Sequence, residues 1–320
     1  MSDILLAVVH MCIFPGGVFA LAVGMLFKGI DRRVEARLQR RVGPPLKQPW
    51  IDVAKLLTKE TLIPRTACKS AFLLAPVVGF TGMAVCAAFI PVPGVFQGLF
   101  NMGDLLVLFY LLPIPAIAMM LGGSASSSPF GAVGFSREML MMLAYETPLL
   151  MVLLAVAMLT GKALGTGAEF SLLKVVGWQL ENGSIGFNPI MVPAFVAYLM
   201  FLPGTLGVAP FDIPEAETEI IEGPLLEYGG PLLALFQIGT ALKSFVVLGL
   251  GVTLFFPGVI CDFWLVNLLW FCLKCLALML LAVTLVKSAT ARFRIEQAFR
   301  FYVTVPTVLA LISLVLVWAM

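Results

Sequence analysis

The stretch Pro231–Phe256, PLLALFQIGTALKSFVVLGLGVTLFF, decides the fold class of this chain. It exceeds the roughly 20 apolar residues that a helix needs to cross a membrane, and Lys243 is its only ionisable residue. Further apolar runs lie along the 320 residues, of which 61% are hydrophobic. They are Ile4–Phe27, Ala71–Pro91, Leu105–Leu121, Met139–Thr160, Pro189–Leu206, Phe263–Val286 and Tyr302–Met320. A water-soluble core cannot bury so much apolar sequence. We therefore predict an all-α polytopic integral membrane protein with about eight transmembrane helices, residues 1–320 forming a single membrane domain.

Charged residues, only 12% of the chain, are concentrated between these runs. The loop Lys28–Lys69 holds eleven Lys and Arg against four acids, and Lys287–Arg300 holds four more basic residues. With eight helices both loops fall on the same side of the membrane, which the positive-inside rule makes cytoplasmic. The predicted cytoplasmic loops cover about residues 28–70, 207–229 and 287–300, and both termini lie outside.

Two shorter segments have the pattern of helices that lie along the membrane surface. In the first loop, apolar residues recur at helical spacing around Trp50 and Leu57, with Asp52 and Lys55 between them. Ala168–Leu180 has a similar pattern on the predicted outer side. We expect interfacial amphipathic helices at both places.

The sequence offers little for redox or phosphate chemistry. His10 is the only histidine, and no glycine-rich phosphate-binding loop is present. Cys272-x-x-Cys275 has the spacing of an iron–sulfur ligand pair, but such a cluster takes four thiolates and the other cysteines are dispersed. We expect no catalytic centre, metal or cofactor in this chain, and no nucleic-acid partner.

An acidic stretch, APFDIPEAETE at 209–219, lies between the fifth and sixth runs. Its carboxylates and the two that follow are Asp212, Glu215, Glu217, Glu219, Glu222 and Glu227. Desolvating a carboxylate without a partner costs several kcal/mol, so the cluster is either a solvated loop that docks a basic partner or a proton-handling segment. Interleaved apolar residues such as Phe211 and Ile220 indicate that the loop folds back into the protein. Crowded carboxylates raise one another's pKa values, which favours proton uptake.

Ionisable residues within membrane-spanning sequence are functional candidates. They are Glu146, Lys243 and Lys274, with Arg137 and Glu138 near the start of the fourth run. Pro148, two residues after Glu146, frees a backbone carbonyl about one turn earlier and favours hydration or a kink beside that carboxylate. The alternative is that Glu146 forms a charge pair with one of the lysines and holds helices together. The residues leave both interpretations open.

The chain resembles the complex I subunit 1 superfamily over an ordered set of motifs from about Arg32 to Arg300. The matching blocks are Leu62-Ile63-Pro64, Phe72–Pro76, Ser124–Ser128, Arg137 with Tyr145-Glu146, Pro210–Glu219 with Glu227-Tyr228, and Ala291–Gln297. Within that superfamily it is most similar to the membrane-anchor subunit of group 4 energy-converting [NiFe] hydrogenases, a branch with formate hydrogenlyase, Ech and membrane-bound hydrogenase types. Ser136–Met139, Glu222–Tyr228 and Leu242-Lys243 carry this closer likeness.

Departures from the quinone-reducing branch support this choice. The first loop lacks the Gly-Pro-Asn-Arg-Val-Gly motif of that branch, and Thr205–Val208 stand where its members carry Glu-Thr-Asn-Arg. Thr240 stands at the position of a glutamate in the sixth helix.

The resemblance implies a membrane subunit of a prokaryotic cytoplasmic (inner) membrane complex that couples electron transfer to H⁺ or Na⁺ translocation. It implies hydrogenase large and small subunits on the cytoplasmic face, which hold the Ni–Fe centre and iron–sulfur clusters, and antiporter-like and other small subunits in the membrane. The alternatives are a subunit of a quinone-reducing NADH dehydrogenase-like or sulfur-reducing complex, and a purely structural anchor.

Two sets of residues follow from the sequence and the resemblance. The predicted proton pathway comprises Glu138, Glu146, Asp212, Glu215, Glu217, Glu219, Glu222, Glu227, Lys243 and Lys274. The predicted interface with the peripheral arm comprises Arg32, Arg33, Arg37, Arg40, Arg41, Gln48, Asp52, Lys55, Arg137, Arg292 and Arg294.

Overall fold

The computed structural model describes residues 9–96 and 104–320, apart from the side chain of Glu217. The described residues are mainly helical and contain no β-strand. Seven segments are long and apolar enough to cross a membrane: Val9–Leu38, Lys69–Phe89, Leu105–Ala125, Pro129–Leu164, Gly230–Phe255, Trp264–Ala289 and Ile295–Ala319. The prediction of an all-α polytopic membrane protein is confirmed.

The helices in these segments are α2 (Gly17–Leu38), α4 (Lys69–Phe89), α5 (Leu105–Leu111), α6 (Ile114–Ala125), α7 (Pro129–Leu164), α11 (Gly230–Phe255), α12 (Trp264–Met279), α13 (Leu285–Ala289) and α14 (Ile295–Ala319). A π-helical turn, η3 (Leu280–Thr284), joins α12 to α13. Shorter helices are α3 (Gln48–Leu57), α8 (Leu172–Asn182), α9 (Val192–Thr205) and α10 (Glu217–Ile220), with 3₁₀ turns η1 (Ile185–Phe187) and η2 (Gly223–Leu225). Helices α3 and α8 coincide with the two predicted amphipathic segments.

The fifth predicted span is shorter than expected. Helix α9 has 14 residues and rises about 21 Å, less than the hydrocarbon thickness of about 30 Å. Proline starts the helix and Pro203 interrupts its last turn. The chain then turns at Gly207, whose φ of +60° suits glycine.

Helix α2 extends beyond its predicted end. The first span was predicted to stop at Phe27, but the helix continues to Leu38 and includes part of the predicted loop 28–70. This polar extension is held by Lys287 of α13, whose Nζ lies 2.7 Å from the Glu35 carboxylate. The predicted start of this run, before Val9, lies outside the described residues.

Helix α7 begins earlier than predicted. It starts at Pro129 rather than Met139, because proline at the first helical position has no N–H to satisfy and its φ already suits a helix. Arg137 and Glu138 therefore lie within the helix, two turns from its start, and Glu138 reaches the protein interior.

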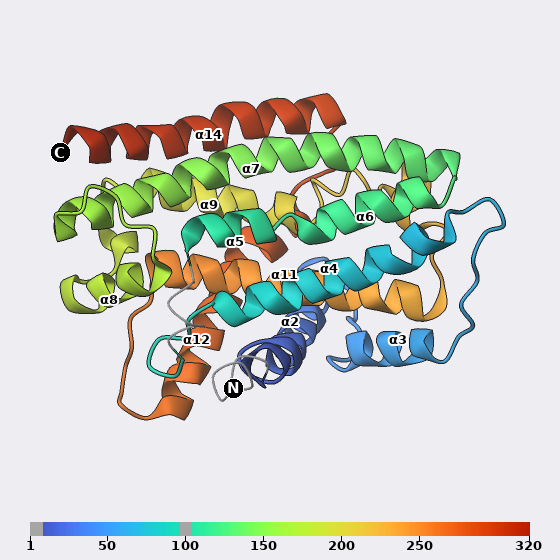
Figure 1. Cartoon of the computed structure of the whole chain (residues 1–320), viewed down its shortest axis with the longest axis horizontal. Coiled ribbons are helices and arrows are strands. Elements are labelled where there is room, and N and C mark those ends of the chain that lie inside the picture. The colour runs from blue at the N-terminus through green and yellow to red at the C-terminus, as the bar shows by residue number, and fades with distance from the viewer. Residues whose placement is uncertain (1–8, 97–103) are drawn as a thin grey trace.

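The long helices lie side by side in a bundle. In Figure 1, α14, α7, α6 and α4 run across the view as neighbouring rods, while α2 is seen nearly end-on and crosses them steeply. Helix α11 lies in the middle and packs against α2, α3, α4 and α12. Its position makes it the central element around which the charged residues gather.

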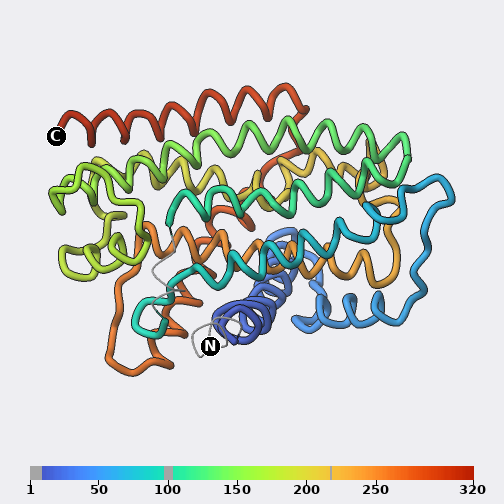
Figure 2. The backbone as a smooth tube through the Cα atoms, in the orientation of Figure 1, coloured from blue at the N-terminus to red at the C-terminus, as the bar shows by residue number. Residues whose placement is uncertain are grey.

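Loops from distant parts of the sequence meet at one end of this bundle, visible at the right of Figure 2. Ser127 Oγ, in the α6–α7 turn, donates to the Thr66 carbonyl oxygen at 3.0 Å. The Phe293 amide donates to the Pro210 carbonyl oxygen at 3.1 Å. The first loop, the acidic loop and the loop before α14 therefore share one end of the molecule.

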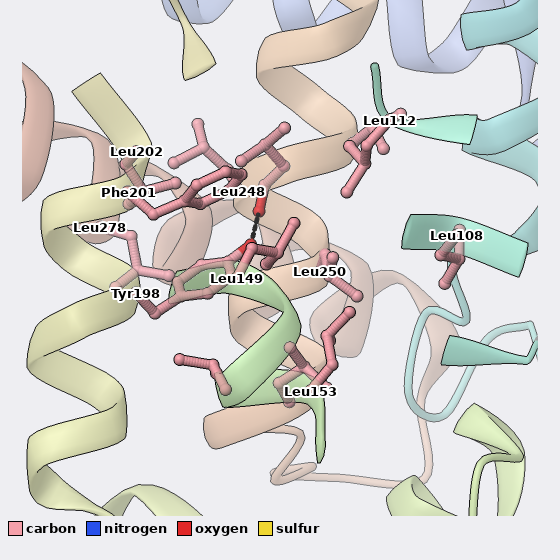
Figure 3. Packing of buried hydrophobic residues seen from close by; sticks show 14 of the residues in the cluster. Leu108, Leu112, Leu149, Leu153, Tyr198, Phe201, Leu202, Leu248, Leu250 and Leu278 are labelled. Carbon is pink, nitrogen blue, oxygen red and sulfur yellow. Dashed lines mark hydrogen bonds between the residues drawn. The ribbon is translucent and has the colours of Figure 1, made fainter. Parts of the chain in front are cut away.

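A purely apolar core fills the bundle beyond the charged residues (Figure 3). Leu149 and Leu153 of α7 pack there with Leu248 and Leu250 of α11. The Tyr198 hydroxyl donates to the Val247 carbonyl oxygen at 2.6 Å, one helical turn after Lys243. The charged residues of the interior thus lie between this core and the loop end.

Candidate functional site

The acidic loop folds back into the protein, as its apolar residues predict. Phe211, Ile213 and Ile220 are buried. The ring of Tyr228 stacks on Phe72 with centroids 4.0 Å apart, and its hydroxyl donates to the Phe72 carbonyl oxygen at 3.1 Å. A Cβ at Gly134 of α7 would collide with the ring of Pro224, so that glycine lets the loop approach α7.

Ion pairs fix the rim of the loop. The Arg292 guanidinium donates from Nε to Asp212 Oδ1 at 2.8 Å and forms an ion pair with the same carboxylate. Arg137 of α7 forms an ion pair with Glu219. Bidentate arginine–carboxylate pairs are among the stronger polar contacts in proteins. These two arginines, predicted to face the peripheral arm, bind the chain's own acidic loop.

Glu215 lies at the junction of three cavities. The innermost, of about 50 Å³, is lined by Glu138, Lys243 and Glu215 together with mostly apolar neighbours. Two outer cavities of about 290 and 310 Å³ open toward α2 and the loop end. Glu215 and Thr240 line all three, so polar space extends from the loop end to the bundle interior.

Glu138 and Lys243 face the inner cavity from adjacent elements. Both are buried, with 7% and 6% of their surfaces exposed. The charges of Glu138, Glu146 and Glu215 all act on Lys243, and its Nζ lies over the ring of Tyr145 at 5.9 Å from the centroid. Lys243 forms no ion pair with any described carboxylate, so the arrangement is a spaced row of charges rather than a closed salt bridge.

Glu146 stands at the inner end of this row. Its Oε1 and the neighbouring Tyr145 Oη are buried and have no hydrogen-bond partner among the described groups. Pro148 lies within the helix, and because it has no N–H the Ala144 carbonyl loses its helical partner. Buried polar atoms without partners cost about 1–3 kcal/mol each. The geometry therefore favours a water molecule or a transferred proton here.

The outer cavities have a basic residue that the sequence did not single out. Lys28 Nζ donates to the Gln237 carbonyl oxygen at 3.2 Å and to Thr240 Oγ1. Nearer the surface, Arg32 pairs with Asp52 of α3 at 3.2 Å. The apolar pattern places Lys28 at the start of a loop, whereas the continuation of α2 carries it inward.

The family follows from comparison with known proteins. The NADH dehydrogenase family model matches residues 10–318. The chain belongs to this family. It is 30% identical over 323 residues to a membrane component of the NADH-quinone oxidoreductase of Rhizorhabdus wittichii, covering 94% of this chain and 89% of the relative. Hydrogenase-4 component C of Escherichia coli K12 is 34% identical over 241 residues, 75% of this chain and 73% of the relative.

A solved relative of this NADH dehydrogenase family member has the same overall structure. It is a chain of the membrane-bound sulfane sulfur reductase, an archaeal respiratory membrane complex, with a TM-score of 0.87 and 29% identity. The match covers 99% of this chain and 100% of the other. The chain is therefore a membrane subunit of a complex I-like, multi-subunit respiratory complex.

Glu215 is the titratable group of this family member that lies outside the spans yet under protein atoms. Burial, chiefly, and then the charges of Glu138, Glu222 and Asp212 raise its pKa, while Lys28 opposes them, leaving a pKa of about 7. The side chain is only partly accessible to solvent, through the cavities. A carboxyl group with this pKa binds and releases protons near neutral pH.

Not all the predicted pathway residues come together. Lys274 donates to the Phe256 and Gly258 carbonyl oxygens at 2.6 and 2.8 Å, at the opposite end of α11 from the loops. Glu222 lines an outer cavity, Glu227 is exposed, and the side chain of Glu217 lies outside the described residues. Within the described ranges no group of three or more His, Cys, Asp or Glu side chains could hold a metal ion.

The predicted arm-facing residues divide into two groups. Arg32, Gln48 and Asp52 form one network, in which Gln48 donates to Asp52 at 2.7 Å. The others that do not pair with the acidic loop are exposed at or near the loop end: Arg33, Arg37, Arg40, Arg41, Lys55 and Arg294. Their role at an interface remains a prediction.

Proposed function

We propose that this chain anchors the peripheral arm of an energy-converting [NiFe] hydrogenase and couples its electron transfer to translocation of H⁺ or Na⁺. The carrying observation is the continuity of polar space and charge from the loop end to Glu146. Three adjoining cavities meet at Glu215, and the innermost reaches Glu138 and Lys243. A purely mechanical anchor has no need of such an arrangement.

In this proposal a proton enters through the outer cavities beside Arg32 and Lys28 and is taken up by Glu215. Glu138 accepts it next, and Lys243 stabilises the carboxylate that is transiently ionised. The proton then reaches Glu146, whose Oε1 has no partner among described groups. Each step moves charge between neighbouring groups that already interact electrostatically.

The route does not continue straight to the opposite face. The apolar core beyond Lys243, which includes Leu149, Leu153 and Leu248, offers no polar group to a proton or a hydrated ion. Transfer of an ion through it would carry the cost of an unsolvated charge. We therefore propose that Glu146 passes charge sideways, to antiporter-like subunits in the membrane.

The hydrogenase assignment is supported by the sequence departures and by the 34% identity to hydrogenase-4 component C. In this chain Thr240 occupies the place of the glutamate of the quinone-reducing branch and accepts a hydrogen bond from Lys28. The proposal expects no cofactor in this chain. The Ni–Fe centre and iron–sulfur clusters would lie in large and small hydrogenase subunits bound to the loop end.

The test is to purify the complex with this chain in mild detergent. Its nickel content and its hydrogen-dependent viologen reduction are measured together. We expect stoichiometric nickel and hydrogen-dependent activity. A complex with iron–sulfur protein but without nickel, and with sulfur or quinone reduction instead, would overturn the assigned reaction.

A sulfur-reducing complex is the second candidate, because the fold matches the sulfane sulfur reductase chain over nearly its full length. A quinone-reducing role would require that turnover depends on added quinone. The same purified complex distinguishes these reactions by its electron acceptor, while the proposed ion route in this chain is common to all of them.

A further inference from the structure

A groove runs between the start of α14 and the middle of α7, away from the cavities described above. It is made of two adjoining cavities of about 230 and 240 Å³, which share Ile295. One lies against the loop end beside Phe293. The other continues along the two helices beside Leu140 and Phe299.

The loop end of the groove is basic. Arg294 and Arg300 line it, both are exposed, and neither forms an ion pair with a described carboxylate. Arg137 and Arg292 also line the upper cavity, but they pair with Glu219 and Asp212. The remaining acid is Glu296. The positive end of the α14 helix dipole adds to the excess of positive charge.

The groove becomes apolar as it leaves the arginines. Leu140 and Leu143 of α7 are 41% and 54% exposed, and Phe299 and Val303 of α14 are 39% and 42% exposed. The two residues on α14 are four apart and lie on one helix face. Together they form an apolar strip that starts beside the basic residues.

The depth of the groove suits the membrane surface. Helix α14 has 25 residues and rises about 37 Å, enough to cross the hydrocarbon core of about 30 Å. Its first residues, joined to the acidic loop through Phe293 and Pro210, therefore lie near the lipid headgroups. Basic pockets at this depth attract anionic lipids.

We propose that this groove binds an anionic phospholipid, with its phosphate held by Arg294 and Arg300 and its acyl chains along the apolar strip. An apolar helix of another subunit fits less well, because it would bury two arginines without supplying an acid. A headgroup supplies the negative charge and stays hydrated. Arg294, predicted to contact the peripheral arm, thus belongs to a lipid site.

A lipid here would touch the fastening of the acidic loop. The upper cavity is lined by the Arg137–Glu219 pair and by Arg292, which holds Asp212. The occupied groove would keep α14, α7 and the acidic loop together. This inference holds for any electron acceptor of the complex, so it does not rest on the hydrogenase assignment.

Native mass spectrometry of the delipidated complex tests the proposal, with phosphatidylglycerol and phosphatidylcholine added in separate titrations. We expect the wild type to retain phosphatidylglycerol in preference to phosphatidylcholine. The double variant R294Q/R300Q should bind phosphatidylglycerol about tenfold more weakly or worse. The matched control R37Q/R65Q removes two exposed arginines elsewhere and should bind as the wild type does. The single variant R300Q, which leaves the N-cap of α14 intact, should show part of the loss.

Equal phosphatidylglycerol binding by the wild type and R294Q/R300Q would overturn the proposal, as would an equal loss in the control. A photoreactive phenylalanine analogue at position 299 of the assembled complex gives an independent result. A phospholipid adduct supports the site. Cross-linking to a neighbouring subunit without any lipid adduct contradicts it and assigns the groove to a protein contact.

Discussion

At the residue scale, Lys243 determines the electrostatics of the interior. It is the only charged residue of α11, and three carboxylates, Glu138, Glu146 and Glu215, act on it. A single positive charge shared among three acids can stabilise whichever of them is ionised. This sharing is what a stepwise proton transfer requires, since the countercharge need not move.

We predict that Lys243→Gln uncouples the complex. Without the lysine, each ionised carboxylate of the row would be buried without a countercharge, so ion movement per electron should fall by about a hundredfold. Lys243→Arg keeps the charge and should retain a measurable part. Ion uptake and electron transfer are measured in the same proteoliposomes. Normal coupling in assembled Lys243→Gln complexes would show that the charge is not used.

The second residue-scale prediction concerns Glu215 and pH. Its pKa of about 7 lies above the ordinary value of 4.5, so the folded protein holds a proton that the unfolded chain would release between these values. This proton binding stabilises the fold fully below about pH 4.5, and the stabilisation is lost as the pH rises through 7.

Infrared titration should therefore show a protonated carboxyl band that disappears with a midpoint near pH 7 and is missing in Glu215→Gln. Glu227→Gln, which alters an exposed acid outside the cavities, is the matched control and should keep the band. If all carboxyl bands of the wild type vanish below pH 5.5, Glu215 is an ordinary acid.

At the scale of elements, the close packing of α2 against α11 positions Lys28 beside Thr240. A Cβ at Gly24 would collide with the Ala241 carbonyl oxygen, so the two backbones can approach only because that residue is glycine. The hydrogen bonds of Lys28, about one turn further along α2, depend on this approach.

We predict that Gly24→Ala separates the two helices and destabilises the protein by about 1–3 kcal/mol, lowering the thermal midpoint of the purified complex. Gly239→Ala is the matched control, because the nearest atom to a Cβ there is 3.9 Å away and alanine favours a helix interior. A thermal midpoint that falls equally in both variants would contradict the packing argument.

The elements were largely predictable from the sequence, since apolar runs of spanning length indicate the long helices. Their ends were not. Helix α2 runs on to Leu38 because ion pairs with a distant lysine hold its polar turns, and no local signal reports such a partner. The early start of α7 did have a local signal, Pro129 after a serine.

At the scale of the whole molecule, the sequence identified most members of the charged row but not how they connect. Glu146, Lys243 and Glu138 were recognisable as charges in apolar sequence. The place of Glu215 at the junction of three cavities, the inward reach of Lys28 and the separate location of Lys274 depend on how the helices pack. These are long-range contacts that periodicity does not encode.

The central claim is that a row of charges from Glu215 to Glu146 carries the translocated charge into the membrane. Its most direct test is Glu146→Gln in the reconstituted complex, with ion movement normalised to electron transfer. We expect normal assembly and continued electron transfer to a viologen, with ion movement reduced at least about tenfold. An unchanged ratio of ions to electrons in the fully assembled variant would contradict the account.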